Sequence, residues 1–193
     1  MSVTDIFQQM APHMIEGMMV HEQLMNSYLF LSLPGYAECH KYHYLSESIG
    51  YIRLCEYISD HYEMVVPSGR PSDPGIIPTS WKDASKDSIT PKIRREAMEG
   101  GLHDWIDWET DTVKLYSKLY EELLTMQEVP ASEFVKKYAL DAEEEIVYAR
   151  QELLHKQAID FDPTFVYEEQ PSLVKLFRHK IKKIGGQAYE DEQ

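Results

Sequence analysis

The sequence has little cysteine and little positive charge. Only two of its 193 residues are cysteines, Cys39 and Cys55. Two are too few for a disulfide framework and favour a reducing compartment. Lysine and arginine number 19 against 33 aspartates and glutamates, which gives a formal net charge of -14. This sign argues against a general nucleic-acid binder, because contacts with phosphate backbones need positive charge. It is typical of a protein that has an acidic surface or that concentrates cations.

Long apolar runs and nucleotide-binding loops are also missing. No stretch reaches the roughly 18 uncharged apolar residues that a membrane helix requires. The first residues lack the basic, apolar and small-residue order of a signal peptide, so we expect a cytoplasmic protein without membrane attachment. The sequence also lacks a glycine-rich phosphate loop and the local motifs of nucleophilic enzymes.

What the sequence does contain is helical periodicity. Apolar residues recur at the spacing of one helix face in four segments, separated by breaks rich in proline and glycine. The expected helices cover about residues 12–33, 37–66, 102–126 and 132–156, with a shorter piece over 91–99. Residues 67–91 contain five prolines and predict a long crossover, in which 79–85 would form a short helix anchored by Trp81. This order predicts an all-α fold, an antiparallel four-helix bundle with one long connection.

The C-terminal segment is expected to be separate from this bundle. We assign residues 1–160 to the bundle domain and 161–193 to an extension, in which 171–184 predicts a short amphipathic helix. Its polar face is the clearest basic patch on an acidic chain, and it is a candidate contact for DNA or another anion. The basic residues are Lys175, Arg178, Lys180, Lys182 and Lys183.

Each of the four long segments carries an ionisable residue within its apolar stripe. The four are Glu22, His61, Glu109 and Glu145. Buried charge is costly unless it is paired or bound to metal, and iron and manganese prefer carboxylate oxygen with some imidazole. We therefore expect these side chains to bind iron, or another divalent metal, inside the bundle. The alternative is that the glutamates reach water at the edges of their stripes and that His61 is a hydrogen-bonded core residue.

Two further histidines suggest a second metal site. His40 and His43 are three residues apart at the start of the second helix, and Glu47 follows one turn later. This spacing suits a metal site at the surface or between subunits. The alternative is that both histidines are simply solvated.

Over roughly residues 10–156 the sequence resembles the ferritin superfamily. The resemblance rests on segments 21–32, 60–63, 107–109 and 134–145. It implies Fe(II) oxidation by oxygen or peroxide and iron storage in a homo-oligomeric shell of twelve or twenty-four subunits. By position it makes His61 and Glu109 ferroxidase ligands and Glu145 an accessory iron ligand. The first-helix glutamate falls on Gln23, beside Glu22, and the bridging glutamate falls on Ile58.

The middle of the chain resembles the Dps (DNA-protection-during-starvation) branch of that superfamily. The resemblance rests on the break at 33–36, on 69–71 and on the Trp81 segment. That branch implies iron ligands between subunits, at positions that fall near Phe30, Tyr42 or His43, Ser59 and Glu63.

Three functions are therefore open. The first is iron binding with ferroxidase activity and storage or detoxification of the iron. The second is a Dps-like structural or DNA-protecting shell, for stress protection, with a degenerate and inactive metal site. The third is a ferritin-like enzyme on a small organic substrate, with Tyr28, Tyr51 and Tyr116 lining its pocket.

Overall fold

The structure is a computed structural model that describes residues 2–62, 65 and 89–190. The described residues form five helices and no strand. The helices are α1 (Val3–Phe30), α2 (Pro34–Tyr62), α3 (Pro91–Thr125), α4 (Val129–Ala158) and α5 (Pro163–Glu190). The short helix expected at 79–85, with Trp81, lies outside the described residues.

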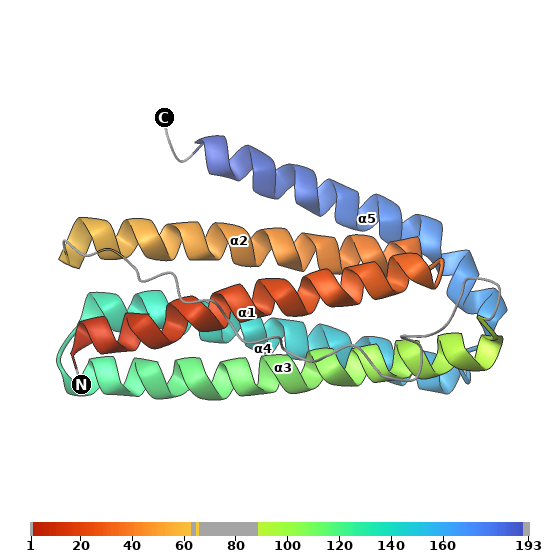
Figure 1. The fold of residues 1–193 in the computed structure, drawn as a ribbon, viewed down its shortest axis with the longest axis horizontal. Helices are drawn as coiled ribbons and strands as arrows, with labels where there is room; N and C mark the ends of the chain where they lie inside the picture. Colours follow the sequence, from red (N-terminus) through yellow and green to blue (C-terminus); the bar gives the residue numbers. More distant parts are fainter. Residues whose placement is uncertain (1, 63–64, 66–88, 191–193) are drawn as a thin grey trace.

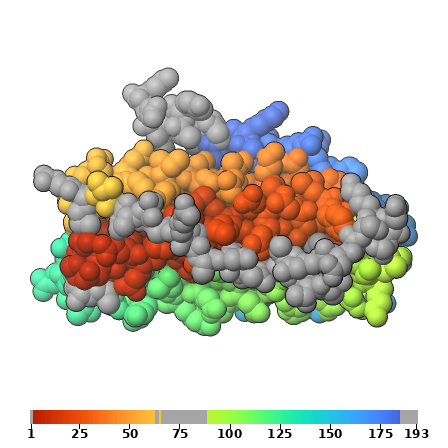
Figure 2. All heavy atoms as spheres, in the orientation of Figure 1, coloured from red at the N-terminus to blue at the C-terminus, as the bar shows by residue number. Residues whose placement is uncertain are grey.

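Helices α1 to α4 form an antiparallel four-helix bundle (Figure 1). α1 and α2 make one hairpin, and α3 and α4 make the other. The end of α2 and the start of α3 lie at opposite ends of the bundle, so the connection between the two hairpins is a long one. In the space-filling view α1 lies between α2 and α3 on the face shown (Figure 2). The predicted bundle with one long connection is confirmed.

Helix α1 begins earlier than the sequence analysis predicted. Ser2 caps it, because its hydroxyl accepts from the Asp5 N–H at 3.2 Å while the Asp5 carboxylate accepts from the Ser2 N–H at 2.7 Å. Pro12, which was expected near the start of the helix, therefore lies inside it. This difference shifts which residues of α1 face the core.

Helix α3 is continuous across Gly100 and Gly101, where the sequence predicted a break. Thr90 caps its start by accepting from the Ile93 N–H at 3.2 Å. Gly101 lies against Tyr28 of α1, so the missing side chain permits a close approach between two helices. α4 likewise starts before residue 132, where the sequence predicted its first residue, and the Ser132 hydroxyl donates to the Val129 carbonyl inside the helix at 2.8 Å.

The core consists of two apolar clusters, one toward each end of the bundle. One includes Leu24, Leu102 and Leu153, and the other includes Met10 and Leu119. Along α3 the first cluster ends at Ile106 and the second begins at Tyr116. The polar residues described below lie in the interval between the clusters on α2, α3 and α4, and beside Val20 of the first cluster on α1.

Helix α5 packs along α2 and diverges from the bundle toward its own C-terminal end (Figure 1). It begins before the predicted residue 171 and contains Pro171 in its interior. Gln170 anchors its first part by accepting from the Gly35 N–H at 2.9 Å. Buried Lys156 of α4 forms ion pairs with Glu152 at 3.6 Å and with Glu169 of α5. Within the described part of the chain, every helix is too short or too polar to cross a membrane.

Candidate metal centre

Four ionisable side chains, one from each helix of the bundle, meet near mid-length: His21 of α1, His43 of α2, Glu109 of α3 and Glu145 of α4. His21 Nε2 lies 3.5 Å from Glu109 Oε1 and 3.8 Å from Glu145 Oε2. His43 Nδ1 lies 2.9 Å from Glu145 Oε2. Single donor atoms of His21, His43 and Glu145 all lie within 4.8 Å of one another. We call these four residues the central cluster.

The distances within the central cluster fit one metal ion. First-row metals bind imidazole nitrogen and carboxylate oxygen at about 2.1 Å, so two ligands at right angles are about 3.0 Å apart. The observed separations of 2.9, 3.5 and 3.8 Å are close to this value. Donor atoms of His21, His43 and Glu145 lie close enough together to share one ion, and Glu109 lies beside them through His21.

Burial makes the cluster costly unless its polar atoms are satisfied. His21 and Glu109 are 0% and 1% exposed, and the Glu145 side chain is 17% exposed. His21 Nε2, His43 Nδ1 and Glu109 Oε1 form no well-aligned hydrogen bond with any described residue. His21 Nε2 lies near Glu109 and His43 Nδ1 near Glu145, but buried polar atoms without well-aligned hydrogen bonds destabilise a fold. A bound cation would satisfy these three atoms together.

Neighbouring side chains hold the cluster in orientation. His21 Nδ1 lies 3.0 Å from His40 Nδ1, and the His40 ring stacks on Tyr28 with ring centroids 5.4 Å apart. If His21 Nε2 is to bind a metal, Nδ1 carries the proton and donates to His40. The Trp105 indole N–H donates to Glu145 Oε2 at 3.2 Å, and the Trp105 ring also contacts that of His40 with centroids 4.8 Å apart.

Burial and neighbouring charges set the protonation of the cluster. Burial, and then the charge of Glu145, raise the pKa of Glu109 well above its usual value. Burial alone would raise the pKa of Glu145, but His43, His21 and Trp105 outweigh it and lower that pKa. Burial lowers the pKa values of His21 and His43, although Glu145 opposes this. Neutral imidazoles beside a carboxylate are the protonation states that metal binding needs.

A third carboxylate lies beside the cluster. Glu47 of α2 lines a cavity of about 40 Å³ together with Glu109 and Glu145. Burial, and then the charges of Glu109 and Glu145, raise the pKa of Glu47 well above its usual value. The interior therefore brings three carboxyl groups together at one depth.

Comparisons with known proteins bear on the fold. No family model and no curated protein sequence matches the chain. Among solved structures, an open-pore ferritin from the hyperthermophilic archaeon Archaeoglobus fulgidus superposes with a TM-score of 0.73 at 13% identity, over 90% of this chain and 97% of that one. The fold is ferritin-like.

Two further structures agree with this assignment. A humanized archaeal ferritin gives a TM-score of 0.71 at 11% identity, over 90% of this chain and 97% of its own. A closed form of the Archaeoglobus fulgidus ferritin, engineered by site-directed mutagenesis, gives 0.69 at 12% identity, over 90% and 96%. At such identities the likeness establishes the ferritin-like fold alone. The resemblance to the Dps branch stays a prediction.

The ferritin-like bundle places Glu109 and Glu145 at the centre, as the sequence predicted. It does not place Glu22 or His61 there. Glu22 is exposed, and the neighbouring His21 faces the core in its place. His61 is exposed in the last turn of α2, with its ring 4.5 Å from that of Tyr57. The expectation that Glu22 and His61 point into the bundle is therefore wrong.

The sequence analysis also placed His40 and His43 wrongly, at the surface or between subunits. Both are buried, at 1% and 7% exposure. Their spacing carried a signal, because His40, His43 and Glu47 continue with Gly50, Leu54 and Ile58 at intervals of three or four residues. Counting histidine as a core residue would have placed both of them inside.

The expected basic face of the extension is only partly available on the surface. Arg178 is engaged with Glu38 at 2.9 Å. Lys180 lies with its Nζ atom 5.2 Å from the ring centroids of Tyr42 and of Phe177. Of the predicted basic residues, Lys175, Arg178, Lys182 and Lys183 are exposed, and Lys180 is half-buried.

The central cluster departs from the usual di-iron pattern of such bundles. That pattern takes one glutamate from each of two helices and a Glu-x-x-His pair from each of the other two. Here the residue three before His43 is His40, and the residue three after Glu145 is Tyr148. Two imidazoles and two carboxylates remain, and this set suits one iron or another first-row divalent metal.

Proposed function

We propose that this chain binds one Fe(II) ion between His21, His43, Glu109 and Glu145 and oxidises it to Fe(III). The oxidant is oxygen or peroxide, which accepts the electron that the iron loses. The observation that carries the proposal is the convergence of donor atoms from four buried helical positions to within a few ångströms. Storage or detoxification of the ferric product completes the proposed role, and the ferritin-like fold supports it.

The residues of the cluster suit this chemistry. Two imidazoles and two carboxylates, each supplying one donor atom, leave coordination positions of a six-coordinate iron open for an oxidant. Burial, and then the charge of Glu145, raise the pKa of Glu109 well above its usual value, and a bound cation would favour its ionised form. The negative charge of the ionised Glu109 carboxylate would stabilise Fe(III) more than Fe(II), since the ferric ion carries the larger charge.

We also propose that the chain forms a homo-oligomer, as a storage shell requires. The outer face of α4 supports this with Leu140, Val147 and Leu154, which are 49%, 55% and 65% exposed. These residues are seven apart and therefore share one face of the helix. A row of exposed apolar side chains marks a contact surface. Leu154→Glu should lower the assembly state in analytical ultracentrifugation, and an unchanged state would place the contact elsewhere.

Aerobic Fe(II) oxidation, followed by the ferric absorption, tests the proposed activity. His43→Ala and Glu145→Gln should each reduce the initial rate to that of iron in buffer, because they remove a ligand from the site. Glu22→Gln and His61→Gln are matched controls, since they alter exposed residues of the same types, and they should oxidise iron like the wild type. Wild-type rates in the first pair would refute the proposal.

A DNA-binding shell is a second candidate, and the exposed cations of α5 favour it. Lys175, Lys182 and Lys183 form a positive surface on an acidic chain. Neutralising all three by substitution with glutamine should abolish a salt-sensitive retention of duplex DNA. Absent retention in the wild type at low salt would remove this candidate.

A further inference from the structure

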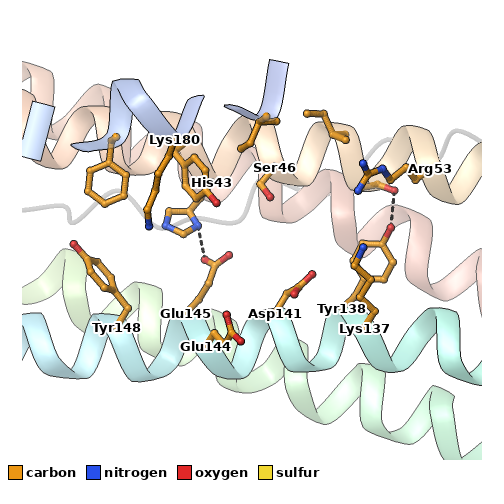
Figure 3. A pocket seen from close by; sticks show the side chains of 15 residues that line it. His43, Ser46, Arg53, Lys137, Tyr138, Asp141, Glu144, Glu145, Tyr148 and Lys180 are labelled. Carbon is orange, nitrogen blue, oxygen red and sulfur yellow. Dashed lines mark hydrogen bonds and ion pairs between the residues drawn. The ribbon is translucent and has the colours of Figure 1, made fainter. Parts of the chain in front are cut away.

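A pocket of about 440 Å³ opens between α2, α4 and α5 and reaches the central cluster (Figure 3). His43 and Glu145 lie in its wall, so the pocket connects one side of the metal site with solvent. α5 contributes another wall through Phe177, Lys180 and Ile184. The volume lies within the range of small-molecule sites, roughly 300–1,000 Å³.

Aromatic side chains form the apolar part of the pocket. Tyr42 of α2, Tyr148 of α4 and Phe177 of α5 come from its three helices. The Phe177 ring centroid lies 6.0 Å from that of Tyr42 and 6.3 Å from that of Tyr148. Such a set of rings offers contact area to an apolar or aromatic body.

Lys180 of α5 supplies a positive charge beside the aromatic rings of the pocket. It is half-buried, and its ammonium group lies over the rings of Tyr42 and Phe177 at 5.2 Å. It forms no ion pair with any carboxylate of the described residues. Figure 3 shows the Lys180 side chain extending from α5 toward His43. Its charge is close enough to contribute to lowering the pKa of His43.

The acidic residues of the pocket do not cancel this cation. Asp141 and Glu144 are exposed, so solvent screens their charges. The carboxylate of Glu145 is already engaged by His43 and Trp105. Arg53, Lys137 and Lys180 are the basic residues of the lining, and the Lys180 ammonium lies over two of the aromatic walls, so an anionic group fits best beside Lys180.

We propose that this pocket binds a small organic carboxylate. The anionic head accepts hydrogen bonds from the Lys180 ammonium beside His43, and the apolar body packs against Tyr42, Tyr148 and Phe177. This goes beyond iron oxidation, because Lys180 offers its charge with or without a metal. With iron bound, the head group would lie next to an ion that His43 and Glu145 hold.

Isothermal titration calorimetry with 4-phenylbutyrate tests the proposal on the full chain, both metal-free and loaded anaerobically with Fe(II). 4-Phenylbutanol and 4-phenylbutylamine are the neutral and cationic controls. We expect saturable binding of the acid that is at least about tenfold weaker in Lys180→Met, the size of effect that one charged hydrogen bond produces. Lys182→Met, an exposed lysine of the same helix, should bind like the wild type.

A second variant keeps the test valid if Lys180→Met perturbs α5. Ser46 is an exposed residue of α2 that lines the same pocket, and Ser46→Trp should fill the space and abolish binding of the acid. Equal affinity for acid, alcohol and amine would overturn the proposal, as would an absence of saturable binding. The proposal would also be overturned if Lys180→Met bound Fe(II) faster than the wild type and the wild type bound no carboxylate. The pocket would then be a path by which cations reach the central cluster.

Metal content, measured on the same samples, separates this proposal from the iron function. Binding of 4-phenylbutyrate by a chain that binds no iron would support the pocket and refute the metal site. Stoichiometric iron without carboxylate binding would support the metal site and overturn the pocket.

Discussion

The contact between Gly101 of α3 and Tyr28 of α1 permits a quantitative test of the packing that supports the site. A Cβ atom at Gly101 would overlap the Tyr28 hydroxyl oxygen and would lie 3.2 Å from Cζ. Tyr28 is only 1% exposed, and its ring stacks on His40, which contacts His21. The ring therefore has little freedom to move aside.

Gly100 provides a matched control in the same turn of α3. No atom lies within 4 Å of the Cβ that an alanine would place there. Gly100→Ala should raise the free energy of unfolding by about 0.5–1 kcal/mol, because alanine loses less backbone entropy in a helix. Gly101→Ala gains the same amount but adds an overpacking cost of about 1–3 kcal/mol. The two variants should thus differ by about 1–3 kcal/mol, which corresponds to roughly 2–4 °C in Tm for each kcal/mol.

Thermal and urea unfolding of both variants measure this difference. The Tyr28 hydroxyl has no hydrogen-bond partner among the described residues, so Tyr28→Phe removes the overlapping atom without breaking a bond. The double variant Gly101→Ala with Tyr28→Phe should regain most of the lost stability. Equal stability of Gly100→Ala and Gly101→Ala would refute the close approach of α1 and α3.

Two further predictions concern stability. Burial lowers the pKa of His13 to about 4, so the unfolded chain binds more protons than the folded one between about pH 4 and 6.5. The resulting contribution of neutral His13 to the free energy of unfolding, at most about 3 kcal/mol, is fully present above pH 6.5. It is lost as the pH falls to 4. Urea unfolding should show less acid destabilisation in His13→Gln than in the wild type, and parallel pH profiles would contradict this. Lys156→Met should cost about 1–3 kcal/mol, because it leaves Glu152 and Glu169 without their buried cation. Glu169→Gln should restore part of that loss in the double variant, and additive losses would argue against the ion pair.

Much of α3 and α4 was predictable because their apolar patterns are long and regular. The stripe through Trp105, Glu109 and Leu119 is buried as the spacing indicated, and Glu145 points to the same centre. Over several turns a repeat of three and four residues leaves one choice of buried face. Glu109 and Glu145 were identified on that basis.

The site residues of α1 and α2 were missed for two physical reasons. On α1, an apparent start at Pro12 hid the early core residues Ile6 and Met10, and the chosen face was one residue out of phase, at Glu22. On α2, periodicity gave the direction around the helix but not the depth along the bundle axis. The pattern therefore assigned His61, which is exposed at the end of α2, to the central site, and it assigned His43 to a site at the surface or between subunits. Depth becomes visible only when the helices are packed.

Anaerobic Fe(II) binding, measured by equilibrium dialysis with elemental analysis, tests the central claim most directly. The central cluster predicts one ion per chain in the wild type and in the exposed control variants Glu22→Gln and His61→Gln. It also predicts loss of that ion in His43→Ala and in Glu145→Gln, both checked for native helix content. Full occupancy in either of the last two variants, or loss of iron in the controls, would contradict the account.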